Sequence, residues 1–163
     1  MKKNYSNNIL ATLCYIVSGD SVLMIHRVGK KYDIHHNKYN GLGGKLEEGE
    51  SPYDCVIREI KEESGIKIKN PVFKGILNFP CFDGKNNWIV FVYVAEVSSR
   101  KFESDSMEGV LEWVKKKDLL KLNLWEGDKI FLKRIFDKNF FYGTFYYKNN
   151  KLLKHSFRLV KSI

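Results

Sequence analysis

The segment from residue 51 to residue 64 is the clearest helix in the chain, and its sequence defines both of its ends. Ser51 is suited to the N-cap, and Pro52 stands at the first helical position, where its missing N–H removes no hydrogen bond. Gly65 can take up the left-handed conformation that ends a helix. Apolar side chains recur at helical spacing and fall on one face: Tyr53, Val56, Ile57 and Ile60.

Three glutamates lie on a second face of this helix. At ~100° per residue, Glu59, Glu62 and Glu63 span an arc of ~100°, whose centre is rotated ~115° from the apolar centre. In an arbitrary helix such a stripe is a solvated face. Here the acids occupy the last turns, where the helix dipole disfavours negative charge. The chain is otherwise basic, with 28 Lys+Arg, 19 Asp+Glu and a net charge of +9. Clustered carboxylates suit Mg²⁺ or Mn²⁺, so the stripe indicates a divalent metal site.

The rest of the chain is rich in strand patterns. A second helix is expected over residues 128–136, and residues 30–40 are expected to form an exposed polar loop. Runs of strands with two helices between them favour an α/β (α+β) fold in mixed layers, formed by one domain over residues 1–163. The strands are expected over residues 10–17, 22–25, 72–82, 88–97, 111–114, 140–147 and 152–160.

Composition excludes several classes of protein. The chain of 163 residues is 44% hydrophobic, enough for a core. The three cysteines form no CxxC pair, which favours reduced thiols and a cytoplasmic location. No apolar run approaches the ~20 residues that span a bilayer, and the first residues do not read as a signal peptide. The positive charge favours a polyanionic partner such as a nucleotide, although it also simply promotes solubility.

The residues around the helix resemble a known family motif. The stretch GKLEEGESPYDCVIREIKEESGI, residues 44–66, matches every fixed position of the Nudix box, G-x5-E-x7-R-E-U-x-E-E-x-G-U, where U is a bulky aliphatic residue. The resemblance implies the Nudix fold, in which a mixed sheet lies between helices and the box forms a loop-helix-loop. It also implies hydrolysis of a nucleoside diphosphate linked to another group, with Mg²⁺ or Mn²⁺ as cofactor.

The same resemblance assigns roles within the box. Glu59, Glu62 and Glu63 would hold the metal, with help from the backbone carbonyl of Gly43. Arg58 and Glu50 would pair to fix the loop on the helix. Gly44 and Gly65 would be structural positions at its two ends. The chemistry implied is metal-assisted attack of water on phosphorus.

Outside the box, the chain resembles the MutT-type branch that removes oxidised purine nucleoside triphosphates such as 8-oxo-dGTP. The resemblance implies that Asn40, Trp125 and Asp128 contact the base and that Glu108 is a loop acid acting as metal ligand or general base. Lys45 could contact phosphate. Each residue also has a plain structural interpretation: a turn asparagine, a core tryptophan, a solvated acid or a solvated lysine. Gly127 departs from the branch, which carries an acid there, and this puts broad tolerance of oxidised bases in doubt.

These patterns lead to one main hypothesis. The chain is expected to be a Mg²⁺-dependent enzyme that converts an oxidised purine nucleoside triphosphate to the monophosphate and pyrophosphate, cleansing the nucleotide pool in support of DNA repair. A hydrolase of ADP-sugars or dinucleoside polyphosphates is an alternative within the same family. A non-catalytic RNA-binding module is an alternative of another class. We expect no membrane association, no stable nucleic-acid partner and, by default, a monomer.

Overall fold

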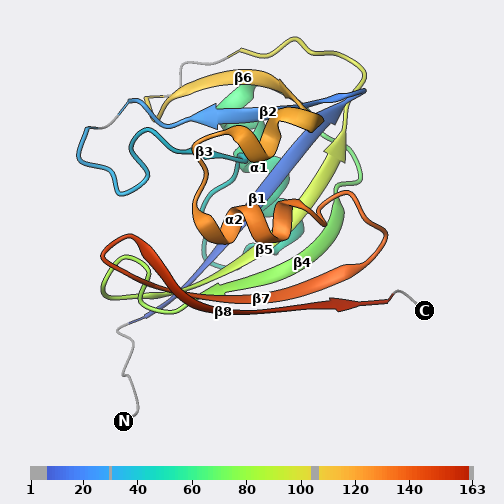
Figure 1. Ribbon diagram of the computed structural model, residues 1–163. Helices are drawn as coiled ribbons and strands as arrows, with labels where there is room; N and C mark the ends of the chain where they lie inside the picture. Colours follow the sequence, from blue (N-terminus) through green and yellow to red (C-terminus); the bar gives the residue numbers. More distant parts are fainter. Residues whose placement is uncertain (1–6, 30, 104–106, 162–163) are drawn as a thin grey trace.

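Within residues 7–29, 31–103 and 107–161, which the computed structural model describes, eight strands form one mixed sheet with a helix on each face (Figure 1). The sheet order is β3-β2-β1-β5-β4-β7-β8, and β6 pairs with β2. The strands are β1 (Asn8–Ser18), β2 (Ser21–His26), β3 (Tyr39–Asn40), β4 (Val72–Phe79), β5 (Asn87–Glu96), β6 (Val110–Lys115), β7 (Phe140–Lys148) and β8 (Lys151–Val160). The helices are α1 (Pro52–Ser64), α2 (Glu126–Leu132) and the short 3-10 helix η1 (Lys116–Lys121). This arrangement confirms the mixed fold expected from the sequence.

Alternation along β1 produces two separate cores. Cys14 and Ile16 pack with Val56 and Ile60 of α1 on one face of the sheet. Tyr15 and Val17 point to the other face, toward α2 and the ends of β4 and β7. Because successive side chains of a strand point to opposite faces, a continuous apolar run can supply both cores. The strand pairs in parallel with β5 along most of its length and therefore forms the centre of the sheet.

Both ends of α1 match the prediction from sequence. The Ser51 hydroxyl oxygen accepts a hydrogen bond from the Asp54 N–H at 3.1 Å, as an N-cap should. At the other end, Gly65 has φ 69° and its N–H donates to the Lys61 carbonyl at 2.9 Å. These local signals position the helix, and with it the acidic stripe, before any tertiary contact is considered.

The second helix differs from the prediction of residues 128–136. It begins at Glu126, because the carbonyl of Trp125 already accepts from the N–H groups of Asp128 and Lys129 at 3.1 and 3.3 Å. It ends at Leu132, after which the backbone closes i to i−3 turns. The strand predicted over residues 72–82 ends at Phe79, since Pro80 follows and Cys81 takes a φ of 52°.

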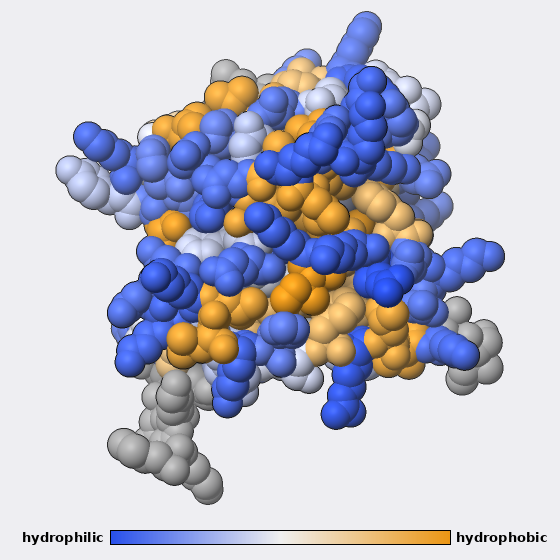
Figure 2. All heavy atoms as spheres, viewed as in Figure 1, coloured by the Kyte–Doolittle hydropathy of each residue, from blue (hydrophilic) through white to orange (hydrophobic). Residues whose placement is uncertain are grey.

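The C-terminal hairpin agrees with the sequence. Asn149 and Asn150 have φ values of 50° and 62°, the conformation of a two-residue turn that joins twisted strands. β8 forms the edge of the sheet beyond β7 (Figure 1). The face of the molecule seen in Figure 2 is largely hydrophilic, with smaller hydrophobic areas between charged side chains. Among the described residues, no helix has both the length and the apolar character needed to cross a membrane.

Candidate active site

The glycine-rich segment before α1 runs along β1 as an additional stretch of extended chain. The Cys14 N–H donates to the Leu42 carbonyl at 2.6 Å, and the Thr12 N–H donates to the Gly44 carbonyl at 2.8 Å. A Cβ atom added to Gly43 would lie 2.2 Å from the Thr12 carbonyl oxygen, and one added to Gly44 would lie 2.3 Å from the carboxyl carbon of Glu59. Gly43, with a φ of 151°, therefore requires glycine, whereas a side chain at Gly44 would displace the Glu59 carboxylate.

Arg58 ties this loop to the helix. Its Nε and Nη2 donate to the two carboxylate oxygens of Glu50 at 2.8 Å each, and Nη2 also donates to the Lys45 carbonyl at 3.1 Å. Such a two-pronged contact fixes direction as well as distance. The Arg58 hydrogen bonds lower the pKa of Glu50 to about 2. The pair of Arg58 and Glu50 expected from the sequence is thus present.

The three glutamates of α1 are in different surroundings. Glu59 has a side chain only 17% exposed and accepts from Arg58 Nη1 at 2.7 Å. Glu63 accepts from the Gly43 N–H at 2.9 Å, and burial raises the pKa of its carboxyl to about 8, with the charges of Glu108 and Glu59 adding to the effect. Glu62 is 59% exposed and lies 3.2 Å from Arg58 Nη1. Glu59 and Glu63 therefore face the same pocket, whereas Glu62 lies toward solvent.

A fourth acid reaches this region from the segment before β6. The Glu108 carboxylate accepts from Arg27 Nη1 at 2.6 Å. On its other side, Arg27 donates from Nε to Asp33 Oδ2 at 3.1 Å, and its Nη2 also pairs with that carboxylate. Asp33 in turn accepts from the backbone N–H of His35 at 3.0 Å. Arg27 thus joins the loop acid to the segment that follows β2.

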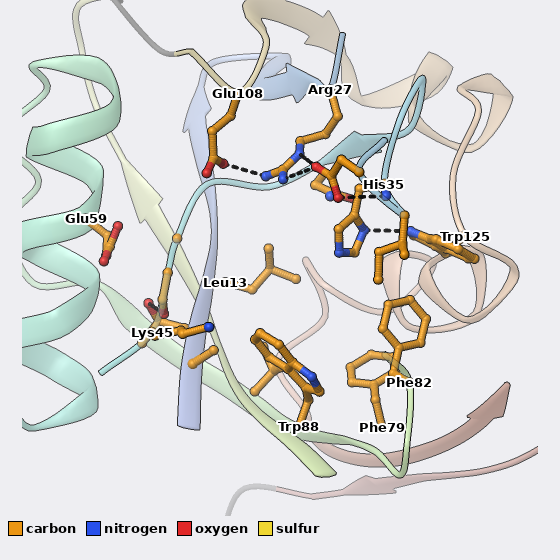
Figure 3. Close-up of a pocket in the computed structure, with 18 of the residues that line it drawn as sticks. Leu13, Arg27, His35, Lys45, Glu59, Phe79, Phe82, Trp88, Glu108 and Trp125 are labelled. Atoms are coloured by element: carbon orange, nitrogen blue, oxygen red, sulfur yellow. Dashed lines mark hydrogen bonds and ion pairs between the residues drawn. The ribbon is translucent and has the colours of Figure 1, made fainter. Parts of the chain in front are cut away.

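These groups surround a cavity of about 640 Å³ with two different ends (Figure 3). Glu59, Glu108 and Lys45 lie toward one end, and Phe79, Phe82 and Trp125 toward the other. The Lys45 ammonium nitrogen lies 5.2 Å from the centre of the Trp88 ring, between the two ends. Of the residues selected from the sequence, all but Glu62 and the structural positions Glu50 and Gly65 line this cavity: Asn40, Gly43, Gly44, Lys45, Arg58, Glu59, Glu63, Glu108, Trp125 and Asp128.

The aromatic end is held together by polar contacts. Trp125 Nε1 donates to His35 Nδ1 at 3.0 Å, and the Phe82 ring lies 5.0 Å from the Trp125 ring in an edge-on arrangement. An indole N–H can only donate, so His35 accepts at Nδ1 and the neutral ring carries its proton on Nε2. Burial, with the charge of Arg27, lowers the pKa of His35 and favours this neutral form. Burial also raises the pKa of Asp128 to about 7.

The neighbours of Gly127 at the aromatic end of the cavity explain why this position is a glycine. Its N–H donates to the Tyr147 hydroxyl at 2.7 Å, and a Cβ atom at this position would lie 2.8 Å from that same oxygen and from the Phe145 ring. An acidic side chain here would displace Tyr147, which lines the cavity. Gly127, at which the sequence lacks the expected acid, is therefore accompanied by Tyr147, whose side chain occupies the space that an acid would need.

The acidic end has the chemistry of a hard divalent cation site. Carboxylate oxygens of Glu59, Glu63 and Glu108 line one cavity, and the absence of a side chain at Gly44 leaves room for the Glu59 carboxylate against the loop. Among the described residues, no three acidic, histidine or cysteine side chains converge as a complete metal cage. Arg58 instead pairs with Glu59 and Glu62, and Arg27 pairs with Glu108.

Sequence reasoning missed several residues of this cavity. Residues 30–40 were expected to be an exposed loop, but Asp33, Ile34 and His35 line the cavity, and Tyr39–Asn40 forms β3. Residues 31–38 do form a loop with mostly exposed side chains, but the expectation was wrong for Asp33 and His35. Arg27, six positions earlier, holds Asp33, and Trp125, 90 positions later, holds His35. Arg27 and Tyr147 were not singled out either. A lone arginine after a strand, or a tyrosine in an aromatic hairpin, carries no local signal for a site.

Comparisons with known proteins agree with this geometry. The profile of the NUDIX domain matches residues 8–135. "Uncharacterized Nudix hydrolase YvcI" from Bacillus subtilis (strain 168) is 34% identical over 140 residues, which are 83% of this chain and 85% of that protein. "Oxidized purine nucleoside triphosphate hydrolase" from Mus musculus is 28% identical over 159 residues, covering 96% of this chain and 99% of that protein.

Among solved structures, the MutT protein from Bacillus halodurans is similar over most of its length. The two chains share 34% sequence identity with a TM-score of 0.80, and the match covers 91% of this chain and 97% of the other. The mixed sheet with α1 and α2 on opposite faces is thus an architecture that this bacterial protein has in common with the chain.

Proposed function

The chain belongs to the NUDIX family, whose members hydrolyse phosphoanhydride bonds of nucleotides, and we propose that it converts an oxidised purine nucleoside triphosphate to the monophosphate and pyrophosphate. The observation that carries this proposal is the division of one cavity into an acidic end and an aromatic end (Figure 3). A nucleoside triphosphate has the same division. The likeness to a mouse protein named for the hydrolysis of oxidized purine nucleoside triphosphates supports the choice of substrate.

The acidic end of the cavity would bind the phosphates. Glu59, Glu62, Glu63 and Glu108, with the Gly43 carbonyl, are the groups that would hold Mg²⁺ or Mn²⁺. When bound, the ion supplies charge neutralisation on the phosphate oxygens and makes water more acidic. Arg58 pairs with Oε1 of Glu59 and Arg27 with Oε2 of Glu108, and each of these contacts involves one of the two carboxylate oxygens. Lys45, at the same end of the cavity and beside Trp88, would contact a phosphate oxygen.

Within this arrangement the carboxylates have separate tasks. Glu63 is half-buried and accepts a backbone hydrogen bond, so its direction is fixed. Glu108 is 39% exposed and anchored by Arg27, which suits a group that orients a water molecule for attack on phosphorus. Arg58 and Glu50 keep the glycine loop against the helix. The reaction then depends on positioning more than on any covalent step of the protein.

The aromatic end would select the base. Phe79, Phe82 and Trp125 offer faces and edges for a purine ring. Asn40 carries both a donor and an acceptor for a base edge, and Asp128 can accept or, when protonated, donate. With a pKa of about 7, Asp128 can take either form near neutral pH. An oxidised purine differs from its parent in the donors and acceptors on its edge, which such groups can distinguish.

Side-by-side hydrolysis of four nucleotides tests the proposal. We expect kcat/KM for 8-oxo-dGTP to be well above that for dGTP, with pyrophosphate released, and with little activity on ADP-ribose or diadenosine tetraphosphate. Activity confined to ADP-ribose or to the dinucleotide would keep the metal site and overturn the base assignment. Omitting Mg²⁺ and Mn²⁺ should abolish turnover.

A further inference from the structure

The β7–β8 hairpin has two unlike faces. Phe141 and Phe145 point into the core beneath α2. The intervening residues point to the opposite face, because side chains alternate along a strand. By register, that face pairs Phe140 with Val160, Tyr142 with Arg158, Thr144 with Ser156 and Tyr146 with Lys154. We name these eight residues the hairpin face.

No helix of the described chain packs on the hairpin face. The core beneath α1 is built from β1, β2, β5 and β6 and includes no residue of β4, β7 or β8. Tyr142 is 49% exposed, and Phe73 of the neighbouring β4 is 38% exposed. The rings of Phe73, Phe140 and Tyr142 follow one another at centroid distances of 5.0 Å. The result is a row of aromatic rings that is open to solvent.

Positive charge accompanies these rings. Residues 140–160 contain four Lys or Arg and no Asp or Glu. The ammonium nitrogen of Lys154 lies 4.6 Å from the centre of the Tyr146 ring, and Arg158 stands directly opposite Tyr142. Lys154 and Arg158 are both exposed. The hairpin face therefore alternates rings and cations across two adjacent strands.

We propose that the hairpin face binds single-stranded nucleic acid, with unpaired bases stacked on Tyr142 and Tyr146 and phosphates paired with Arg158 and Lys154. Aromatic rings in a basic sheet are the elements from which sequence-tolerant single-strand sites are made. A second copy of the chain is disfavoured as occupant, since each face carries two cations and no acid, so two such faces would repel each other. Four alternate positions on β7 extend over ~20 Å, enough for a few nucleotides.

This site is separate from the nucleotide cavity. Tyr147 lines the cavity, whereas its neighbour Tyr146 lies on the other side of the sheet with Lys154. The inference departs from the expectation, drawn from sequence, that the protein has no stable nucleic-acid partner. It does not depend on the proposed hydrolysis, because it would hold for an inactive protein as well.

Fluorescence anisotropy with a labelled 12-nucleotide oligo-uridylate or oligo-thymidylate, in EDTA and about 50 mM NaCl, tests the site. We expect Tyr142→Ala to weaken binding about tenfold and Tyr142→Phe to restore it, since stacking needs the ring and not the hydroxyl. Arg158→Ala should make the slope of log affinity against log salt concentration less steep, by the amount expected for the loss of about one phosphate contact. The matched controls are Tyr53→Ala and Lys133→Ala, which remove an exposed ring and an exposed cation elsewhere.

Four results would overturn the inference. They are an absence of binding, equal loss in the Tyr53→Ala control, equal affinity for a duplex of the same length, and a dimer that Tyr142→Ala converts to monomer in light scattering. Saturating the cavity with dGTP in EDTA should leave oligonucleotide binding unchanged. Displacement by dGTP would be a fifth result against the inference, because the oligonucleotide would then enter the cavity instead. A thermal melt of each variant shows whether the fold is retained.

Discussion

Arg27 Nη1 lies 2.6 Å from Glu108 Oε2, in a contact that joins residues 81 positions apart in the chain. Asp33 holds the opposite side of the same guanidinium. The loop acid is therefore not a free surface carboxylate: its place depends on a residue at the end of β2 and on the loop that follows. Asp33 acts here as a positioning residue, through Arg27.

The substitution Asp33→Asn should distinguish a role in positioning Glu108 from a role in binding the substrate. The amide keeps the shape and still accepts from the His35 N–H, but it loses the charge that fixes Arg27. With 8-oxo-dGTP as substrate, we expect kcat to fall about tenfold while KM changes less than twofold, because misplacement of a reacting group affects the chemical step. His36→Ala, which alters the same loop outside the cavity lining, is the control. A rise in KM alone would assign Asp33 to binding instead.

The glutamates of α1 should behave as one unit. Glu59→Gln, Glu62→Gln and Glu63→Gln should each lower kcat/KM at least about a thousandfold, and combining two of them should cost far less than the product. Glu62 is the sharpest case, because the structure places it toward solvent. Glu48→Gln, at an exposed residue of the same loop that is not part of the cavity lining, is the matched control. Retained activity in Glu62→Gln would remove that residue from the metal site.

Trp125→Phe should weaken base selection. Phenylalanine keeps an aromatic ring but lacks the indole N–H that donates to His35 Nδ1. We expect the ratio of kcat/KM for 8-oxo-dGTP over dGTP to fall by about fivefold or more, which is the scale of one lost hydrogen bond. Trp113→Phe is the control, because Trp113 Nε1 donates to the Arg100 carbonyl outside the cavity. Equal effects of the two substitutions would argue against a role of Trp125 in selection.

Asp128→Asn should change how stability depends on pH. The folded-state pKa of Asp128 is about 7, above its ordinary value of 3.8, so the unfolded chain releases this proton first as pH rises. Through Asp128 the wild-type protein therefore loses stability between roughly pH 4 and pH 7, and the asparagine variant lacks this contribution. The variant's melting temperature minus that of wild type should increase from pH 4.5 to pH 8. Asp137→Asn serves as control, and a difference that stays constant with pH would contradict the assignment.

Local signals explain what the sequence could predict. The ends of α1 depend on Ser51, Pro52 and Gly65, all within the segment itself, and the acidic stripe follows from helical spacing. The alternation and turn residues of the last hairpin likewise act over a few positions. Such features survive almost any tertiary context, which is why the box and its loop were found where they were predicted.

Contacts between distant segments explain what the sequence could not predict. His35 enters the cavity because Trp125, 90 positions later, donates to it. Polar residues 30–40 resemble a solvated loop in any local window. Only the assembled sheet shows that part of this loop is a wall of the cavity.

The parallel pairing of β1 with β5 has a consequence for how the protein is made. From Asn8 to Val17, each residue of β1 pairs with a residue of β5 that lies 79 positions further along the chain, as Asn8 does with Asn87. The glycine-rich segment before α1 forms backbone hydrogen bonds with the other edge of the same strand. Contacts at such separation form slowly. On a ribosome, the first strand would leave the exit tunnel long before its neighbour, so the catalytic loop can acquire its final support only after more than half of the polypeptide has been synthesised.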